Sequence, residues 1–203
     1  LVNYSDTEEV FRSQRPEIVY HCAANAREGA SFYDPYKIVN SNALISSVVI
    51  ELGVKYGMKK LVYTSSMARY GDQQVPLSEK LPPRPIDIYG ASKVLVETMI
   101  QMLAETHSFQ WTILVPHNCF GEHQSLSDRY RNVIGIFLNC ILRHEPLYLY
   151  GKDHVRAFSY MGDCLPAFTK AAELHPKLNR ELINIGGIEP VTIKEVAEEV
   201  IKN

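Results

Sequence analysis

The five residues from Tyr89 to Lys93, Tyr-Gly-Ala-Ser-Lys, are the part of this sequence with the clearest capacity for chemistry. If the segment is helical, the tyrosine and the lysine lie four positions apart on one face. A neighbouring ammonium group favours the phenolate and would lower the pKa of Tyr89 towards neutrality. The positive end of the helix dipole acts in the same direction. Such a tyrosine can act as a general base towards a sugar hydroxyl group.

This spacing is not specific by itself, because the chain has 12 tyrosines and two further pairs share it, Tyr33 with Lys37 and Tyr56 with Lys60. Tyr89 differs because a Ser65-Ser66 pair lies upstream, at the carboxyl end of a predicted strand. A serine at that point can hydrogen-bond to the hydroxyl group that Tyr89 deprotonates. Tyr56 has no such partner at its helix end, and Tyr33 lies in a predicted loop. Tyr89 is therefore the candidate catalytic residue.

The elements that would hold these residues are predicted by the alternation of short β-rich runs with longer helical runs. Strands are expected at 18–22, 61–64, 111–115 and 182–185, helices at 36–56, 89–107, 132–143 and 162–174, and a proline-rich loop at 72–86. Strands separated by single helices pair in parallel through right-handed crossovers. The predicted fold is α/β, with a doubly wound, Rossmann-like parallel sheet that binds ligands beyond the carboxyl ends of its strands.

The pattern changes after Pro116, where the loops become longer. We therefore expect residues 1–116 to form a sheet domain that is incomplete at its N-terminus, and residues 117–203 to form mostly a small α/β substrate-binding lobe, with the chain crossing back. Thr192 and Glu195 predict a capping box at the start of a last helix. The chain has no initial Met and ends just after this helical pattern, which suggests a fragment of a longer protein.

The composition excludes several classes of protein. Apolar residues make up 46% and charged residues 22% of the chain, as in globular domains and unlike disordered chains. A net charge of -2 provides no basic field for nucleic acid, so no nucleic-acid partner is expected. No uninterrupted apolar run reaches the roughly 18 residues of a membrane-spanning helix, so no membrane partner is expected either. The scattered cysteines are typical of reduced thiols in a cytoplasmic protein: Cys22, Cys119, Cys140 and Cys164.

Seven segments follow one another in a distinctive order: Val19-Tyr20-His21-Cys22-Ala23-Ala24, Asn42, Val62-Tyr63-Thr64-Ser65-Ser66 with Tyr70-Gly71, Tyr89-Gly90-Ala91-Ser92-Lys93, Pro116-His117-Asn118-Cys119-Phe120-Gly121, Arg156-Ala157-Phe158-Ser159-Tyr160, and Asn184-Ile185-Gly186-Gly187. They span nearly the whole chain. As an ordered set they resemble the extended short-chain dehydrogenases/reductases, specifically the NAD-dependent nucleotide-sugar epimerases and dehydratases. The resemblance implies that residues 1–116 are a partial NAD-binding domain.

The same resemblance implies a role for each matching residue. The catalytic set would be Ser66, Tyr89 and Lys93, and Lys93 would also bind the nicotinamide ribose of NAD. The other expected cofactor-binding residues are Ala23, Ala24, Asn42, Thr64, Pro116 and His117. The expected substrate-binding residues are Ser66, Asn118, Asn132 and Arg156. Among these, Arg156 has a planar guanidinium group that suits the diphosphate of a nucleotide sugar. Arg129 and Arg131 are expected either at the surface or near this diphosphate. Related enzymes are dimers, so helices 36–56 and 89–107 would form a homodimer across a two-fold axis.

The choice of reaction depends on the two residues after Ser66. A 4,6-dehydratase needs an acidic pair there, whereas this chain has Met67 and Ala68, which transfer no proton. An additional Cys and His pair, typical of epimerases that also reduce a keto sugar, is not found. The expected activity is therefore that of a UDP-hexose 4-epimerase, in which Tyr89 takes the 4-hydroxyl proton while hydride passes to NAD and returns to the other face of the rotated keto sugar. Epimerases of UDP-glucuronate or of a UDP-N-acetylhexosamine remain alternatives.

One departure from the family concerns glycine. The first strand–turn–helix of the family carries a glycine-rich turn that binds the pyrophosphate of the cofactor. None of the 11 glycines here forms a G-x-x-G-x-x-G or G-x-G-x-x-G pattern, so this chain alone is expected to bind NAD weakly or not at all. The second hypothesis is therefore a cofactor-deficient fragment or non-catalytic remnant of the same fold.

No metal is expected, because His117, Cys119 and His123 lack the spacing of zinc ligands.

Overall fold

The structure is a computed structural model that describes residues 1–128, 132–173 and 175–202. The chain divides into two compact units. The first consists of Leu1–Val115 and Ala167–Asn184, and the second of Pro116–Pro166 and Ile185–Asn203.

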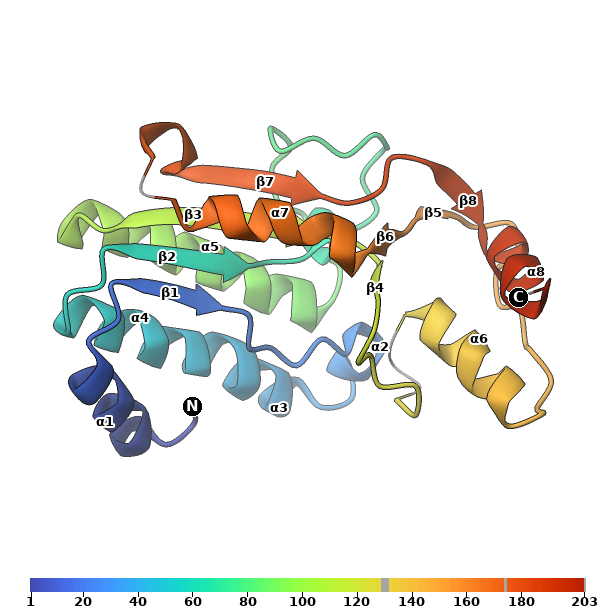
Figure 1. Ribbon diagram of the computed structural model, residues 1–203, viewed down its shortest axis with the longest axis horizontal. Coiled ribbons are helices and arrows are strands. Elements are labelled where there is room, and N and C mark those ends of the chain that lie inside the picture. Colours follow the sequence, from blue (N-terminus) through green and yellow to red (C-terminus); the bar gives the residue numbers. More distant parts are fainter. Residues whose placement is uncertain (129–131, 174, 203) are drawn as a thin grey trace. The chain divides into compact units, whose positions relative to one another are not determined.

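A four-stranded sheet with the order β1-β2-β3-β7 forms the centre of the first unit (Figure 1). Its strands are β1 Ile18–His21, β2 Lys60–Thr64, β3 Gln110–Pro116 and β7 Glu181–Ile185. β1 pairs in parallel with β2, and β2 in parallel with β3, with Leu61 opposite both Val19 and Trp111. The carboxyl ends of these strands therefore meet at one edge of the sheet, which is where Ala23 and Ser66 follow their strands.

Helices flank this sheet, with α5 on one face and the end of α7 that belongs to this unit, Ala167–Ala171, on the other (Figure 1). The longer helices are α1 Tyr4–Gln14, α4 Ile45–Lys55, α5 Ile88–His107 and α7 Met161–Ala171. The shorter ones are α2 Glu28–Ser31, α3 Pro35–Val39 and the 3-10 helices η2 Met67–Tyr70 and η3 Pro176–Leu178. A π-helical turn, η1 Asn40–Leu44, joins α3 to α4, so the helix expected at 36–56 is one continuous stretch with an irregular turn. The expected α/β fold with a parallel sheet is confirmed.

The core of the first unit follows from alternation along the strands. Leu61 and Tyr63 of β2 and Ile113 of β3 pack in one cluster with Val96 and Ile100 of α5, and all of these side chains are buried. The stretch Pro35–Lys55 is long and apolar enough to cross a membrane by length and composition alone. Of its buried side chains, Ala43 and Ile50 belong to this core, as in a helix that packs on a sheet. Val48, Val49 and Leu52 pack instead in a second cluster with Phe11.

The described residues of the second unit include two small sheets, the helices α6 and α8, and the start of α7. Cys119–Phe120 (β4) pairs in parallel with Ser159–Tyr160 (β6), and Val155–Ala157 (β5) pairs antiparallel with Pro190–Thr192 (β8). Helix α6, Val133–Leu142, packs against helix α8, Ile193–Lys202.

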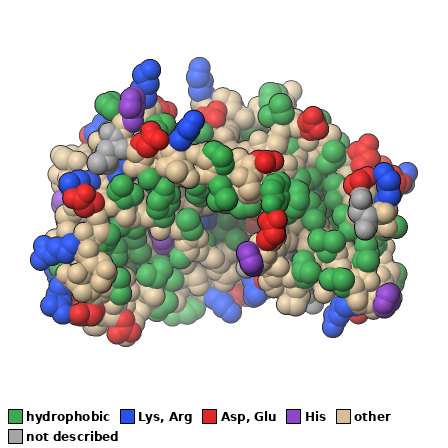
Figure 2. All heavy atoms as spheres, viewed as in Figure 1, with side chains coloured by type: hydrophobic (Ala, Val, Ile, Leu, Met, Phe, Trp, Pro, Cys, Tyr) green, Lys and Arg blue, Asp and Glu red, His purple; other side chains and the backbone are tan. Residues whose placement is uncertain are grey.

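The expected capping box at the start of α8 is confirmed. The backbone N–H of Thr192 donates to Oε2 of Glu195 at 2.7 Å, and the N–H of Glu195 donates to Oγ1 of Thr192 at 3.1 Å. The arginines expected either at the surface or near a diphosphate, Arg129 and Arg131, lie outside the described residues. On the face shown in Figure 2, Lys and Arg side chains are interspersed with Asp and Glu, as expected from the small net charge.

Candidate active site

Ser66 and Tyr89 lie on two segments that pack closely. Ser66 is the second residue after β2, and its hydroxyl oxygen accepts the N–H of Ala68 at 3.2 Å, which caps η2. The carboxylate of Asp87 accepts the N–H of Gly90 at 2.7 Å, so α5 begins immediately before Tyr89. A Cβ atom on Gly90 would lie 2.6 Å from the carbonyl oxygen of Ala68. Only glycine therefore lets the first turn of α5 approach the segment after Ser66 this closely.

Lys93 is buried beside Tyr89. Its ammonium nitrogen donates to the carbonyl oxygen of Thr64 at 2.7 Å and lies 4.9 Å from the ring centre of Tyr63 and 5.8 Å from that of Tyr89. Burial lowers the pKa of Lys93 to about 8, against the opposing effects of Cys22 and Glu97. The structure therefore brings Tyr89 and Lys93 together, and the lysine is mainly a cation below pH 8.

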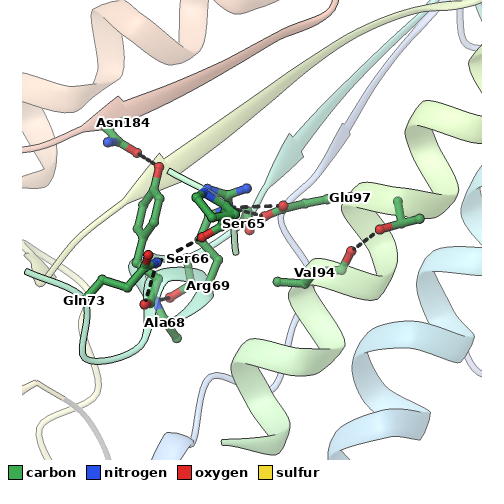
Figure 3. Close-up of polar contacts among 11 residues, drawn as sticks. Ser65, Ser66, Ala68, Arg69, Gln73, Val94, Glu97 and Asn184 are labelled. Atoms are coloured by element: carbon green, nitrogen blue, oxygen red, sulfur yellow. Dashed lines mark hydrogen bonds and ion pairs between the residues drawn. The ribbon is translucent and has the colours of Figure 1, made fainter. Parts of the chain in front are cut away.

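A buried ionic network holds the segment that contains Ser66 (Figure 3). The carboxylate of Glu97 on α5 accepts a hydrogen bond from the hydroxyl group of Ser65. The same carboxylate accepts Nε–H of Arg69 through both oxygens, each at 3.1 Å. Sequence reasoning missed Glu97, although it continues the four-residue spacing of Tyr89 and Lys93.

Asn42 joins two parts of the first unit. It is 1% exposed, and its amide oxygen accepts the N–H of Asn25 at 2.7 Å. Its amide nitrogen donates to the carbonyl of Asn25 at 3.3 Å and to the hydroxyl oxygen of Ser92 at 3.0 Å. The side chain thus ties the segment after β1 to helix α5, and its expected direct contact with the cofactor stays a prediction.

The carboxyl edge of the sheet has features that fit a nicotinamide nucleotide. Ala23 and Ala24 are exposed just beyond β1, and their small side chains leave the backbone open to approach. Thr64, which is half-buried, donates its hydroxyl to the sulfur of Cys22 at 3.3 Å. Burial lowers the pKa of His21 to about 4, with the neighbouring lysine acting in the same direction, so this imidazole stays neutral beside the Lys93 cation. Ala23, Ala24, Thr64 and Lys93 could therefore hold part of a nicotinamide nucleotide, whereas His21 is buried and bonded to Ser46.

Pro116, His117 and Asn118 lie in the second unit. Pro116 and His117 are half-buried, and the N–H of His117 donates to the carbonyl of Ile185 at 3.2 Å. The carbonyl of His117 accepts the hydroxyl of Ser159 at 2.9 Å. Asn118 is exposed with a φ of 42°, and its amide donates to the carbonyl of Ala157 at 2.8 Å.

Asn132 and Arg156 also belong to the second unit but differ in how their polar groups are used. The side-chain oxygen of Asn132 caps α6 by accepting the N–H of Gly135, and its amide nitrogen donates to the carbonyl of Cys119 at 2.5 Å. Arg156 is exposed, with one guanidinium nitrogen on the carbonyl of Val155 at 2.8 Å. Arg156 is thus the more accessible of the two for an anionic ligand.

The two other Tyr–Lys pairs have different surroundings. The hydroxyl group of Tyr56 donates to the carboxylate of Glu8 at 3.0 Å, and Lys60 is buried with its ammonium group on the carbonyl of Glu173 at 2.6 Å. Tyr33 is 89% exposed. Neither pair lies at the carboxyl ends of β1 and β2. Within the described residues, no three His, Cys, Asp or Glu side chains gather as metal ligands.

A parallel α/β sheet with a Tyr–Lys pair at the start of a helix, beside the carboxyl ends of the strands, defines a short-chain dehydrogenase/reductase-like protein. The chain belongs to the NAD dependent epimerase/dehydratase family, whose family model matches residues 1–186. NAD is the cofactor of this family, in agreement with the expectation from the sequence.

Individual relatives are UDP-glucose 4-epimerases. The enzyme of Streptomyces lividans is 30% identical over 194 residues, which are 90% of this chain and 59% of that protein. The Thermotoga maritima enzyme, solved with UDP-glucose, has a TM-score of 0.93 and 28% identity over 99% of this chain and 65% of that one. The Thermus thermophilus enzyme, solved with NAD, has a TM-score of 0.90 and 29% identity over 99% of this chain and 66% of that one. This chain therefore spans less than two thirds of the length of each.

Proposed function

We propose that the protein catalyses the NAD-dependent epimerisation of a nucleotide-diphosphate sugar at C4, with a UDP-hexose as substrate. The observation that carries this proposal is the position of Lys93, whose ammonium group is fixed by the Thr64 carbonyl and lies 5.8 Å from the ring centre of Tyr89. Membership of the family and similarity to UDP-glucose 4-epimerases support it.

In this reaction, each proposed site residue would have a separate role. Tyr89 takes the proton of the 4-hydroxyl group as general base and later returns it. The Lys93 cation stabilises the phenolate, and the hydroxyl group of Ser66 hydrogen-bonds to the same sugar oxygen. Asn118 and Arg156 bind the diphosphate, for which the guanidinium fork is well shaped. Bound NAD supplies reversible hydride transfer at C4 of the sugar.

Epimerisation is favoured over dehydration by the residues that follow Ser66. Met67 and Ala68 form the start of η2 and are half-buried. Neither side chain can donate or accept a proton, which 4,6-dehydration would require at this point.

The test is an assay of the full-length protein with UDP-glucose, UDP-glucuronate and UDP-N-acetylglucosamine, with products resolved by chromatography. Formation of UDP-galactose supports the proposal. If only UDP-glucuronate or only UDP-N-acetylglucosamine is turned over, the protein is an epimerase of that alternative sugar nucleotide. No turnover of any of them contradicts the proposal and favours a non-catalytic remnant.

The matched pair of variants for this assay is Tyr89→Phe and Tyr56→Phe. Tyr89→Phe removes the proposed general base and should abolish turnover. Tyr56→Phe removes the hydroxyl group of another tyrosine with a lysine four positions on, whose partner is Glu8. It should keep turnover within about twofold of the parent, since this half-buried hydroxyl group contacts Glu8 and not the proposed site. Near-parental turnover in Tyr89→Phe would contradict the proposal.

We also propose that the protein forms a homodimer through the helical stretch Pro35–Lys55 and α5. These helices pack side by side, and each leaves apolar side chains exposed, including Tyr36 and Leu44 on the first and Leu95 and Met102 on the second. Joining two such faces would remove apolar surface from water. Sedimentation of the full-length protein should give a dimer, and Leu95→Asp should shift it to a monomer. A monomeric full-length parent protein would contradict the proposed homodimer.

A further inference from the structure

A buried carboxylate lies one helical turn beyond Lys93 on α5. Glu97 is 3% exposed, and its two partners Ser65 and Arg69 are 2% and 5% exposed. Both partners belong to the Ser66 loop, defined here as residues Ser65–Tyr70. Figure 3 shows Glu97 extending from α5 to meet them. The loop is thus joined to the helix by an ionised group rather than by apolar packing alone.

Glu97 lies on the same face of α5 as the two catalytic candidates. Tyr89, Lys93 and Glu97 are spaced by four residues, and such residues lie above one another along a helix. A side chain that anchors the loop from this face therefore fixes the loop relative to Tyr89 and Lys93.

The loop has further anchors at its far end. The N–H of Arg69 donates to the carbonyl of Ser66 at 3.0 Å, and the carbonyl of Arg69 accepts the N–H of Arg84 at 2.8 Å. The hydroxyl group of Tyr70 donates to Oδ1 of Asn184 at 2.9 Å. Ser66 thus lies between two residues, Ser65 and Arg69, that converge on one carboxylate.

The energetics of such a pair favour a positional role. Desolvation of two buried charges offsets much of their attraction, so a buried ion pair adds little net stability. Nη1 of Arg69 finds no acceptor within the part of the chain that the structure describes, which adds a further desolvation penalty. The carboxylate nevertheless fixes the loop at two points, because it accepts both Nε–H of Arg69 and the hydroxyl group of Ser65.

We propose that Glu97 is a positioning residue that holds the Ser66 hydroxyl group in register with Tyr89 and Lys93. This inference rests on the proposed epimerase function, for which it identifies the group that sets the catalytic geometry. Glu97 acts through the Ser66 loop and through its charge.

The charge of Glu97 also acts on Lys93. The groups around this lysine are Cys22, the neutral imidazole of His21, the phenols of Tyr63 and Tyr89, and Glu97. Among them, Cys22 and Glu97 raise the pKa of Lys93 against the lowering effect of burial. Removal of the Glu97 charge should therefore lower the pKa of Lys93 below about 8.

The experiment compares Glu97→Gln with Thr112→Val in the full-length protein. Thr112 is also buried, and its hydroxyl donates to the carbonyl of Leu178 rather than to the Ser66 loop. Glu97→Gln should lower kcat by about 10²-fold, the effect of a small misplacement of reacting groups, with a smaller change in KM. On the alkaline side of the pH profile, the activity of Glu97→Gln should also fall at a lower pH than the activity of the parent. Thr112→Val should lose stability but keep the kcat and pH profile of the parent.

Hydrogen exchange at the amides of Ala68 and Arg69 provides a readout that needs no turnover. Both amides donate to Ser66, so Glu97→Gln should speed their exchange and Thr112→Val should not. If Glu97→Gln does not fold, Ser65→Ala removes one bond without removing the charge and should speed the same exchange. Unchanged exchange in the folded variant, or unchanged kcat and pH profile in an active enzyme, overturns the inference. A parent without turnover contradicts the proposed function instead, and the exchange result then decides this inference by itself.

Discussion

The ammonium group of Lys93 is held 2.7 Å from the carbonyl oxygen of Thr64 and lies 5.8 Å from the ring centre of Tyr89. The carbonyl belongs to the last residue of β2, and the ring belongs to the first turn of α5. One cation therefore joins the end of a central strand to the helix that carries the proposed base. Burial of this cation disfavours its charged form, so its position has a consequence for stability as well as for catalysis.

Replacement of Lys93 by Met should lower kcat at least about 10²-fold, since the phenolate loses its cation. It should also change stability in a pH-dependent way. The pKa of Lys93 is about 8 in the folded chain and 10.5 when unperturbed, so the charged lysine opposes folding below pH 8 and this opposition fades as the pH rises towards 10.5. The stability of Lys93→Met relative to the parent should therefore decrease between pH 8 and pH 10.5. Denaturant unfolding at several pH values measures this, and a constant difference would contradict it.

Gly90→Ala should separate helix α5 from the Ser66 loop. The added Cβ would meet the carbonyl oxygen of Ala68 at 2.6 Å, and a backbone atom cannot move aside without shifting the loop. We expect kcat to fall about 10- to 100-fold and the melting temperature to fall as well. The control is Gly29→Ala on α2, where a Cβ meets nothing within 4 Å. That change should leave kcat alone and keep or slightly raise stability, so equal kcat in the two variants would count against the argument.

Asn42→Ala should destabilise the first unit by roughly 2 kcal/mol, because the part-buried N–H of Asn25 loses its acceptor and the hydroxyl oxygen of Ser92 loses one donor. Denaturant unfolding measures the loss. Ser47→Ala, at a more accessible position of the same helical stretch, is the control and should change stability by less than about 1 kcal/mol. Similar losses of unfolding free energy in both variants would show that the Asn42 contacts do not stabilise the unit by this amount.

Calorimetric titration of the 203-residue chain with NAD should give weak binding or none. The proposed site has groups that would bind the nicotinamide ribose, but no glycine-rich turn occurs in this sequence to receive the pyrophosphate. A micromolar dissociation constant would contradict this prediction and show that other backbone amides of this chain bind the pyrophosphate.

The sequence predicts the elements well where apolar patterning is strong. The strands around Val62 and Ile113 and the helix that begins beside Tyr89 lie close to their expected positions. The pairing of Tyr89 with Lys93 follows from helical spacing, and the upstream serines separate it from the pairs at Tyr33 and Tyr56. These inferences depend on local geometry, which the order of residues specifies directly.

The contacts that support the site depend instead on tertiary packing. Glu97 meets Ser65 and Arg69 only where α5 packs on the end of β2, so its spacing from Lys93 indicates its helix face but not its partners. The same holds for Asn42, whose partners come from distant parts of the chain.

The order of the sheet has a consequence for biogenesis. β7 lies beside β3, although residues 116–166 of the second unit intervene between the two strands. A ribosome must therefore synthesise most of the second unit before the first can complete its sheet. Until then β3 presents an open edge, and an open edge can recruit a strand from another molecule. Truncation before Glu181 should accordingly yield aggregated rather than soluble polypeptide.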